Sequence, residues 1–329
     1  MHKITYNHIS KAANDFVDHV ENRRIGKNKS LKTSSKKFNN SILDGLDWNR
    51  ILTVAGTSGS GKSMIAEQFK RDFVDLNPDV KFKILSFEFE MLAMDQVARS
   101  VSGKTGLSTK KLYSGQNYKI SPTQLENIKK QAEKVSDYPI YTVDHICNVA
   151  QIQQTIFEFI ENEKIAEKEK KIVITIDHLL LTQGKEGQME KQVIDDLCKM
   201  LVGMKKILKD VYNIDVIIIM LSQLNRQIES MERVMNPKVH YPTKNDLFGS
   251  SYIYQASDYV LITHNPSEIE GIERYGPPRG TEYPLGLPKM NPKNKEEPMI
   301  YWHLIKSRFG MKEIMMMVGK FAESKIVDF

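Results

Sequence analysis

Short apolar runs alternate with helix-like stretches along the chain from about Trp48 onward. Runs that are apolar at nearly every position and rich in β-branched residues are typical of strands buried on both faces of a sheet. Helical stretches between such strands favour parallel pairing. The pattern therefore predicts an α/β fold with a mostly parallel central sheet. Its candidate strands are Ile51–Ala55, Phe82–Phe87, Ile140–Val143, Ile172–Ile176, Val216–Leu221, Tyr259–Thr263 and Tyr301–Ile305, with Met315–Val318 as a late candidate after a turn at Gly310.

The first 45 residues follow a different pattern. Apolar residues recur at helical spacing over Ile9–Val20, which predicts an amphipathic helix with one apolar face. Arg23–Lys37 is rich in Lys, Arg, Ser and Asn, a composition typical of a polar tether. We therefore divide the chain into an N-terminal docking helix with its tether, residues 1–45, and a main domain, residues 46–329. A lone amphipathic helix cannot bury its own apolar face, so we expect it to dock on its own domain or on a neighbouring subunit.

Residues 266–298 interrupt the alternation within the main domain. They are dense in proline, glycine and charged residues. This composition predicts a long, mobile loop or insertion.

Composition excludes a few classes of protein. The chain has 329 residues, of which 40% are hydrophobic and 27% charged, an ordinary profile for a soluble globular protein. No run approaches the ~18 apolar residues of a membrane span, and the N-terminus lacks an apolar signal core, so we expect a cytoplasmic protein without membrane contact. Cys147 and Cys198 lack metal-ligand spacing. The net charge of +6 is compatible with a polyanionic partner, although many basic proteins bind no nucleic acid.

A complete G-x-x-x-x-G-K-[ST] phosphate loop joins the first candidate strand to a helix predicted over Met64–Phe73. The strand delivers the loop, and the helix N-terminus presents free N–H groups to phosphate. A lysine in this position can reach the β- and γ-phosphates, and the following hydroxyl can bind Mg²⁺. The flanking strand and helix argue against a chance glycine-rich turn. The pattern predicts a site for ATP or another nucleoside triphosphate with Mg²⁺, formed by Gly56, Thr57, Ser58, Gly59, Ser60, Gly61, Lys62 and Ser63.

Carboxylates at two strand ends are candidates for the metal and the catalytic step. Asp177 ends the run Ile172–Ile176, and at the end of a strand next to the phosphate-loop strand it could hold the Mg²⁺ shell. The alternative role for Asp177 is to cap the next helix. Glu88 follows Phe82–Phe87 and could orient the water that attacks the γ-phosphate. Glu90 is a rival for this role, and a solvated acidic turn is the plain alternative.

Three polar residues after later strands complete the candidate site. Gln223 follows Val216–Leu221, where its amide could hydrogen-bond the γ-phosphate or the attacking water. It could equally be the polar start of a loop. Lys306 and Arg308 end another strand before a glycine turn and could clamp phosphate, or could form a basic hairpin facing solvent.

These segments, in this order, resemble the C-terminal ATPase domain of DnaB-type replicative helicases, which are hexameric ring helicases with a RecA-like core. The resemblance covers roughly residues 9–329. Ser86–Phe89 resembles the family's S-L-E-M, whose glutamate is the catalytic base, and this selects Glu88 over Glu90. Ser222–Arg226 matches S-Q-L-N-R residue for residue. The other matching segments are Ile176–Leu181 for V-I-D-Y-L-Q-L, Pro242–Asp258 for P-x-x-S-D-L-R-E-S-G-x-I-x-Q-D-A-D, and Lys306–Gly310 for K-N-R-x-G.

The resemblance implies an ATP-dependent ring helicase that moves 5′→3′ on single-stranded DNA and unwinds duplex DNA during replication. Lys306 and Arg308 would reach the nucleotide of the neighbouring subunit, and the helix at Ile9–Val20 would be the linker helix that docks on that neighbour. The chain begins at this helix, so we expect a reduced, phage- or plasmid-like form without the family's large N-terminal domain. A loader or a primase is an expected partner.

The predicted path of DNA follows two loops that lead from the ends of the Asp177 and Gln223 strands. The arginine of the family's R-E-S-G is absent, because Phe248–Ser251 stands there, so contact would rest on backbone N–H groups and hydroxyls. The candidate DNA-binding residues are Lys185, Lys191, Arg226, Arg233, Lys238, Lys244, Gly249 and Ser250. Any single lysine among them could instead serve only to keep a surface loop soluble.

Two other functions remain open at this level. The chain could be a RecA-like DNA-binding ATPase, such as a loader or recombination accessory, that does not unwind DNA. It could also be a nucleotide-binding scaffold without turnover, although Glu88 beside the phosphate loop argues against that.

Overall fold

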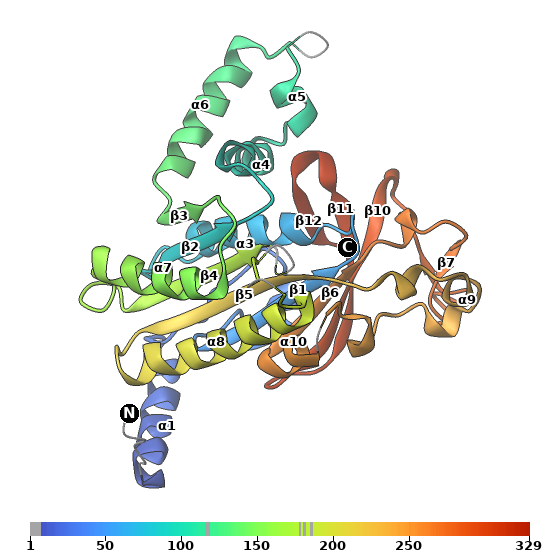
Figure 1. Ribbon diagram of the computed structural model, residues 1–329. Coiled ribbons are helices and arrows are strands. Elements are labelled where there is room, and N and C mark those ends of the chain that lie inside the picture. Colours follow the sequence, from blue (N-terminus) through green and yellow to red (C-terminus); the bar gives the residue numbers. More distant parts are fainter. Residues whose placement is uncertain (1–7, 116–118, 178, 180–181, 185–186, 250) are drawn as a thin grey trace.

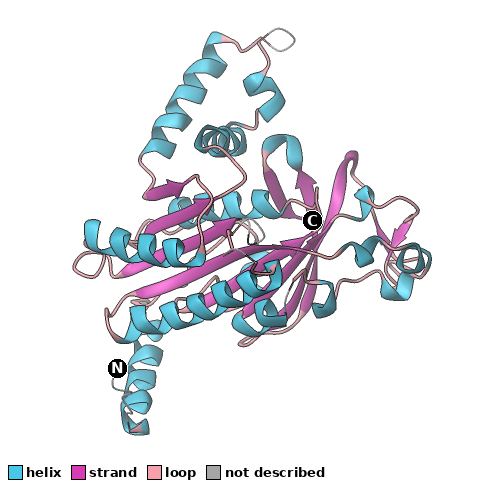
Figure 2. Ribbon diagram, viewed as in Figure 1, coloured by secondary structure: helices cyan, strands magenta, loops and turns pink. Residues whose placement is uncertain are grey.

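The computed structural model describes residues 8–115, 119–177, 179, 182–184, 187–249 and 251–329. It is a layered α/β structure in which helices cover both faces of a twisted central sheet (Figures 1 and 2). None of the helices in the described ranges has the length and apolar character that a membrane crossing needs.

The main sheet confirms the predicted mostly parallel α/β fold. Its strands are β1 (Arg50–Gly56), β2 (Lys83–Glu88), β3 (Ile140–Val143), β4 (Lys171–Asp177), β5 (Asp215–Gln223), β6 (Tyr259–His264), β9 (Met290–Asn291), β10 (Asn294–Ser307), β11 (Glu313–Lys320) and β12 (Lys325–Asp328). Their order is β12-β11-β10-β6-β1-β5-β4-β2-β3, and β9 pairs with β10. Neighbours from β6 to β3 are parallel, whereas β10, β11 and β12 extend the sheet in antiparallel fashion.

Helices α3, α7 and α8 are amphipathic and bury their apolar faces on this sheet. The α-helices are α1 (Ile9–Arg24), α2 (Lys36–Ser41), α3 (Lys62–Leu76), α4 (Ala93–Thr105), α5 (Thr109–Tyr113), α6 (Pro122–Ser136), α7 (Val149–Asn162), α8 (Glu190–Asp210), α9 (Met231–Met235) and α10 (Ser251–Ala256). Helix α3 packs Ile65, Phe69 and Phe73 against one face, while α7, α8 and α10 cover the other. Helices α4, α5 and α6 form a lobe that projects beyond β3 (Figure 1). The 3-10 turns are η2 (Arg226–Glu229), η3 (Pro237–Val239), η4 (Lys244–Asp246), η5 (Pro266–Glu268) and η6 (Phe321–Glu323).

The predicted N-terminal helix is present, but the predicted tether is wrong over its second half. Helix α1 buries none of its residues and extends away from the body of the molecule (Figure 1). Leu31 and Phe38, in contrast, are fully buried. Leu31 forms an antiparallel bridge with Leu46, and the Phe38 ring stacks on Phe69 at 5.3 Å between centroids. The main body therefore begins at about residue 29 rather than 46, because two apolar anchors outweigh a polar composition.

Residues 266–298 are also more ordered than their composition predicts. Strands β7 (Arg274–Tyr275) and β8 (Leu287–Pro288) form a small antiparallel sheet, and β9 and the start of β10 follow. Tyr275 is fully buried, and its hydroxyl is hydrogen-bonded to His264 Nδ1 at 2.6 Å and His303 Nε2 at 2.8 Å. The segment is an insertion anchored to the sheet by one buried aromatic residue.

Replacing Phe38 should show that the segment before β1 belongs to the folded domain. Phe38→Ala removes a fully buried ring that contacts Phe69 and Trp302, so the free energy of unfolding should fall by ~3–5 kcal/mol. Phe16→Ala is the matched control, since the Phe16 ring on α1 is 64% exposed, and its effect should stay within ~0.5 kcal/mol. Urea unfolding measures both. If both substitutions had equally small effects, the segment before β1 would be a polar tether, as the composition predicted.

Candidate nucleotide-binding and catalytic site

The phosphate loop lies at the centre of the sheet, where β1 ends between β5 and β6 and α3 begins. Two of its glycines are required by geometry. A Cβ at Gly56 would lie 2.3 Å from Ser60 Oγ and 2.6 Å from the Thr263 carbonyl oxygen. Gly61 caps α3 at φ +88°, a left-handed conformation that side chains disfavour. The loop can therefore curl tightly and aim the N-terminus of α3 at a bound phosphate.

Hydrogen bonds within the loop hold it in this shape. Ser60 Oγ donates to the Thr57 carbonyl oxygen at 2.8 Å, and Thr263 Oγ1 donates to the Ser60 carbonyl oxygen at 2.8 Å. Lys62 Nζ also donates to the Thr57 carbonyl oxygen, at 2.9 Å. Burial lowers the pKa of Lys62, against the opposing charges of Asp177 and Glu90. The ammonium group thus lies over its own loop, where a polyphosphate would supply the anion that it needs.

The two candidate carboxylates meet at the same edge of the sheet. Glu88 and Asp177 are direct neighbours in the register of β2 and β4. The strand order corrects one expectation, because β5 separates β4 from the phosphate-loop strand β1. Asp177 nevertheless hydrogen-bonds to Ser63, the last residue of the phosphate loop. The strand that pairs with β1 on this side is β5, and Gln223 at its end lies opposite Gly56.

Asp177 has the environment of a carboxylate that can bind a cation. It is 4% exposed, and burial together with the nearby charge of Glu88 raises the pKa of its carboxyl to about 7, against the hydrogen bond from Ser63. Its Oδ1 is buried and has no hydrogen-bond partner among the described residues. A divalent cation is the ligand that relieves both conditions. No group of three His, Cys, Asp or Glu side chains in the described ranges could hold a metal ion.

Glu88 is held by a buried lysine that the sequence pattern did not reveal. Glu88 is 3% exposed, and its Oε1 accepts hydrogen bonds from Lys70 Nζ at 2.5 Å and from Ser86 Oγ. Lys70 Nζ also lies 2.5 Å from Glu67 Oε1. One feature of the sequence could have revealed this lysine. A Glu and a Lys lie three residues apart among the large apolar residues of α3, and charged residues are seldom found on the buried face of a helix.

Lys306 and Arg308 lie far from the phosphate loop of their own chain. They end β10, where Ser307 pairs with Tyr259 at the start of β6, whereas Gly56 pairs with Thr263 near its end. The four steps between Tyr259 and Thr263 span about 13 Å at ~3.3 Å per residue. Lys306 Nζ donates to the Tyr254 carbonyl oxygen at 2.5 Å, and burial, with the charge of Arg308, lowers the pKa of Lys306. Arg308 pairs with Asp258 at 3.4 Å.

The candidate DNA-binding residues fall into four groups. Lys191, Arg226, Lys238 and Lys244 are exposed at the starts or in the turns of α8, η2, η3 and η4. Arg233 is engaged within its own segment, since it forms an ion pair with Asp246 and donates to the carbonyl oxygens of Val239 and Tyr241 at 2.9 Å. Gly249, at φ +88°, leaves room for the Ile194 side chain. Lys185 and Ser250 lie outside the described residues.

The segment 226–249, which was predicted to be a loop, has regular structure over much of its length. Short helices follow one another along it, and a bridge between Leu224 and Leu247 closes its base. The ion pair between Arg233 and Asp246 joins two parts of this segment. The charge pattern alone had suggested that Arg233 was available to bind DNA.

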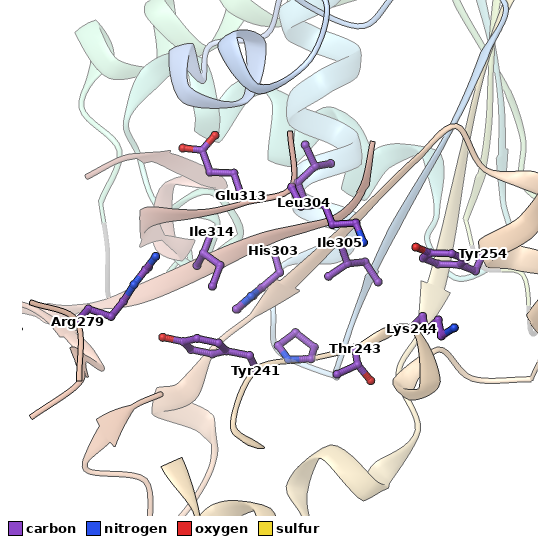
Figure 3. Close-up of a pocket in the computed structure, with 12 residues that line it drawn as sticks. Tyr241, Thr243, Lys244, Tyr254, Arg279, His303, Leu304, Ile305, Glu313 and Ile314 are labelled. Carbon is purple, nitrogen blue, oxygen red and sulfur yellow. The ribbon is translucent and has the colours of Figure 1, made fainter. Parts of the chain in front are cut away.

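A cavity of about 620 Å³ adjoins this segment (Figure 3). It lies between residues 241–244 and strands β10 and β11, and it is lined on the two sides by Tyr241 and Lys244 and by His303 and Glu313. No phosphate-loop residue lines it. The cavity is therefore distinct from the nucleotide site and borders the predicted DNA-contacting segment.

The family sequence model described as DnaB-like helicase C terminal domain matches residues 30–310. The chain belongs to the DnaB-like helicases. It is accordingly an ATP-hydrolysing replicative helicase. The match begins where the buried residues begin, at Ser30 and Leu31, and it leaves α1 outside.

Two solved structures share the fold of this DnaB-like helicase. One, described as an ATPase domain, superposes with a TM-score of 0.74 at 16% identity, over 99% of this chain and 100% of that chain. The other, a DnaB-like replicative helicase described with its interactions with primase, has a TM-score of 0.71 at 16% identity, over 100% of this chain and 68% of that chain. They confirm the predicted RecA-like core. No curated protein matches the sequence.

Neutralising Asp177 should stabilise the nucleotide-free helicase in a pH-dependent way. The folded-state pKa of about 7 lies above the ordinary value of 3.8, so the folded state loses stability relative to the unfolded state as the pH rises between these values. Asp177→Asn removes this loss. Its advantage should grow from pH 4 upward, reaching ~1–4 kcal/mol at pH 8.

Denaturant unfolding at pH 5 and pH 8, without nucleotide, measures the difference. Asp137→Asn, which removes an exposed carboxylate at the end of α6, is the control and should show no such trend. An advantage that is the same at both pH values would contradict the environment described for Asp177.

Proposed function

We propose that this DnaB-like helicase is a Mg²⁺-dependent ATPase that assembles as a ring, moving along single-stranded DNA in its central channel and unwinding duplex DNA during replication. The observation that carries the proposal is the meeting of Glu88 and Asp177 beside a complete phosphate loop in a chain of this family. The 5′→3′ direction follows from the family resemblance alone.

Each residue of the nucleotide site has a role that its position supports. Lys62 neutralises the β- and γ-phosphates, and Ser63 with Asp177 holds Mg²⁺, which neutralises the phosphate charge when it is bound. Glu88 orients and polarises the attacking water. Gln223, at the end of the strand next to the loop, contacts the γ-phosphate or that water and passes its loss to the segment that follows.

The catalytic site is shared between subunits in this proposal. Lys306 and Arg308 lie at the opposite edge of the sheet from their own phosphate loop, so a neighbouring copy is the one whose γ-phosphate they can reach. Helix α1 supports the same arrangement, since Phe16 and Val17 are each 64% exposed on a helix that buries nothing. The helix would dock on the adjacent subunit of a hexameric ring.

DNA would run along the two segments that follow β4 and β5. The exposed cations Lys191, Arg226, Lys238 and Lys244 suit phosphate contact, with Lys185 and the 249–250 backbone as further contacts. Arg233 would act through the shape of the segment, because its guanidinium is already paired. Contact to phosphates predicts binding that is nearly independent of sequence.

Partners and location complete the proposal. One neighbouring structure is described with its interactions with primase, and a primase or a loader is the partner we propose here as well. The site of action would be the cytoplasm, where replication of a bacterial, phage or plasmid genome takes place.

One observation favours a second function. Phe248 stands where the family resemblance places an arginine that contacts DNA phosphate. A chain with weakened contact there could hydrolyse ATP on DNA as a loader or recombination accessory without separating strands. Unwinding of a forked substrate distinguishes the two.

Rings mixed from two inactive variants should recover activity. Arg308→Ala removes the trans cation and Glu88→Gln removes the base, so an interface that joins an intact Glu88 to an intact Arg308 has a complete site. Since such an arginine contributes ~10³–10⁵ in rate, ATP hydrolysis and displacement of a strand from forked DNA should both exceed the activity of either variant alone.

The control mixes Glu88→Gln with Lys62→Ala, two lesions on the phosphate-loop side of the site, and should recover nothing. Absence of recovery in assembled rings that mix Arg308→Ala with Glu88→Gln subunits would place the cations outside the active site. Wild-type rings that hydrolyse ATP on DNA but leave the fork intact would establish the second function instead.

Removing the exposed lysines of the proposed DNA path should flatten the salt dependence of binding. Each phosphate contact on single-stranded DNA contributes about −0.7 to the slope of log K against log salt. The triple variant Lys191→Gln, Lys238→Gln and Lys244→Gln should therefore have a slope shallower by up to ~2, measured by fluorescence anisotropy with oligonucleotides of two sequences.

A second triple variant keeps the change in net charge the same. It replaces Lys129, Lys130 and Lys134, which are exposed on α6, and should leave the slope unchanged. If both triple variants weaken DNA binding equally, the overall positive charge of the protein, and not the proposed path, is responsible for the binding.

A further inference from the structure

A buried cluster of charges links the phosphate-binding helix to the strand that carries Glu88. Lys70 lies two turns beyond Lys62 on α3 and is 1% exposed. Its Nζ lies 2.5 Å from Glu67 Oε1, 2.5 Å from Glu88 Oε1 and 3.0 Å from Ser86 Oγ. The ammonium group therefore directs all three of its N–H donors to named acceptors at the end of β2 and on its own helix.

The electrostatics of this cluster keep Lys70 charged. Burial by itself would lower the pKa of Lys70, but the charges of Glu67 and Glu88 outweigh burial and raise it. Burial and the charge of Glu88 raise the pKa of Glu67, against the attraction of Lys70. The lysine is thus a permanent cation that faces two buried acids.

The hydrogen bonds distinguish the two oxygens of Glu88. Oε1 accepts from both Lys70 and Ser86, whereas no hydrogen bond from any described residue reaches Oε2. A carboxylate with one oxygen held by a rigid donor can rotate little, so the direction of its second oxygen is set. That second oxygen is the one left to accept a hydrogen bond from water.

We propose that Lys70 is a positioning residue for ATP hydrolysis, which holds Glu88 through Oε1 and directs Oε2 to the attacking water. The inference rests on the proposed role of Glu88 as the base. Because α3 carries Lys62 and Ser63 as well, one rigid helix then fixes both the phosphates and the base, and their separation cannot drift. Misplacement of such a group by about 1 Å can cost ~10²-fold in rate.

A purely structural role for Lys70 makes different predictions, and the neighbouring residue supplies the control. Arg71 is also buried on α3, and it donates to the carbonyl oxygens of Ser324 and Arg99 rather than to Glu88. Lys70→Met and Arg71→Met each remove one buried cation from the same turn of the same helix. Only the first should change the chemistry.

The experiment measures single-turnover ATP hydrolysis and binding of a non-hydrolysable ATP analogue by assembled protein. Lys70→Met should lower the rate ~10- to 100-fold with analogue affinity within about two-fold of wild type. A loss of rate without a loss of affinity is what a misplaced Glu88 produces, because Glu88 takes no part in holding the nucleotide. Arg71→Met should keep the wild-type single-turnover rate, whatever stability it loses.

Two further variants keep the inference testable if Lys70→Met does not fold. Glu67→Gln/Lys70→Met leaves Glu88 as the one charged member of the cluster and should show the same slow rate with analogue affinity unchanged. Ser86→Ala removes the other donor to Oε1 and should lower the rate by a smaller factor.

The outcomes separate this inference from the function on which it rests. If Glu88→Gln hydrolyses ATP at the wild-type rate, the base is elsewhere and the proposed role of Glu88 fails. If Glu88→Gln is inactive but Lys70→Met and the double variant keep the wild-type single-turnover rate, Lys70 is structural and the inference is overturned. Loss of rate from Lys70→Met that is undiminished in the Glu88→Gln background would also overturn it.

Discussion

The structure depends on charge that is buried before any ligand is bound. Lys62, Lys70, Glu88 and Asp177 are all nearly inaccessible at the end of the parallel strands. Lys70 and Glu88 neutralise each other, whereas Lys62 donates to a loop carbonyl and Asp177 leaves an oxygen without a partner among the described residues. A buried site with unbalanced charges holds a charged ligand strongly, because the local dielectric is low and the dipoles are already in place. The free energy that this arrangement costs must be supplied by the rest of the fold.

Packing around α3 supplies the free energy that the buried charges cost. Phe38 from the N-terminal segment and Trp302 from β10 both contact Phe69 on this helix. At the other end of the chain, Gln68 exchanges hydrogen bonds with the backbone of Ile326 at 2.8 and 2.9 Å. Segments nearly three hundred residues apart therefore hold α3, the helix that begins at the phosphate loop, and Ser35 Oγ donates a hydrogen bond to Asp328 Oδ1 at 2.6 Å to join them. This ties nucleotide geometry to the integrity of both chain ends.

The same fold leaves other groups incomplete in a single chain. Helix α1 exposes its apolar face, and Lys306 and Arg308 rest on carbonyl oxygens of α10 and on Asp258 instead of on a phosphate. Asp258 is itself buried and also holds Lys205 and the Ile51 backbone N–H. The cations are thus kept in a defined place at the edge opposite the phosphate loop, which is what the proposed site shared between two subunits requires.

The sequence by itself determined the sheet and the phosphate loop. Short apolar strands and the G-x-x-x-x-G-K-[ST] spacing are local signals, so Ile140–Val143 and the strand before Gly56 lie where they were predicted. Tertiary structure alone decided the strand order that puts β5 between β4 and β1, the burial of Phe38 and Tyr275 within polar or Pro-rich segments, and the pairing of Lys70 with Glu88. Each of these features depends on a partner that is distant in the chain. A sequence shows that a residue is charged, but it does not show which distant residue will balance that charge in the folded protein.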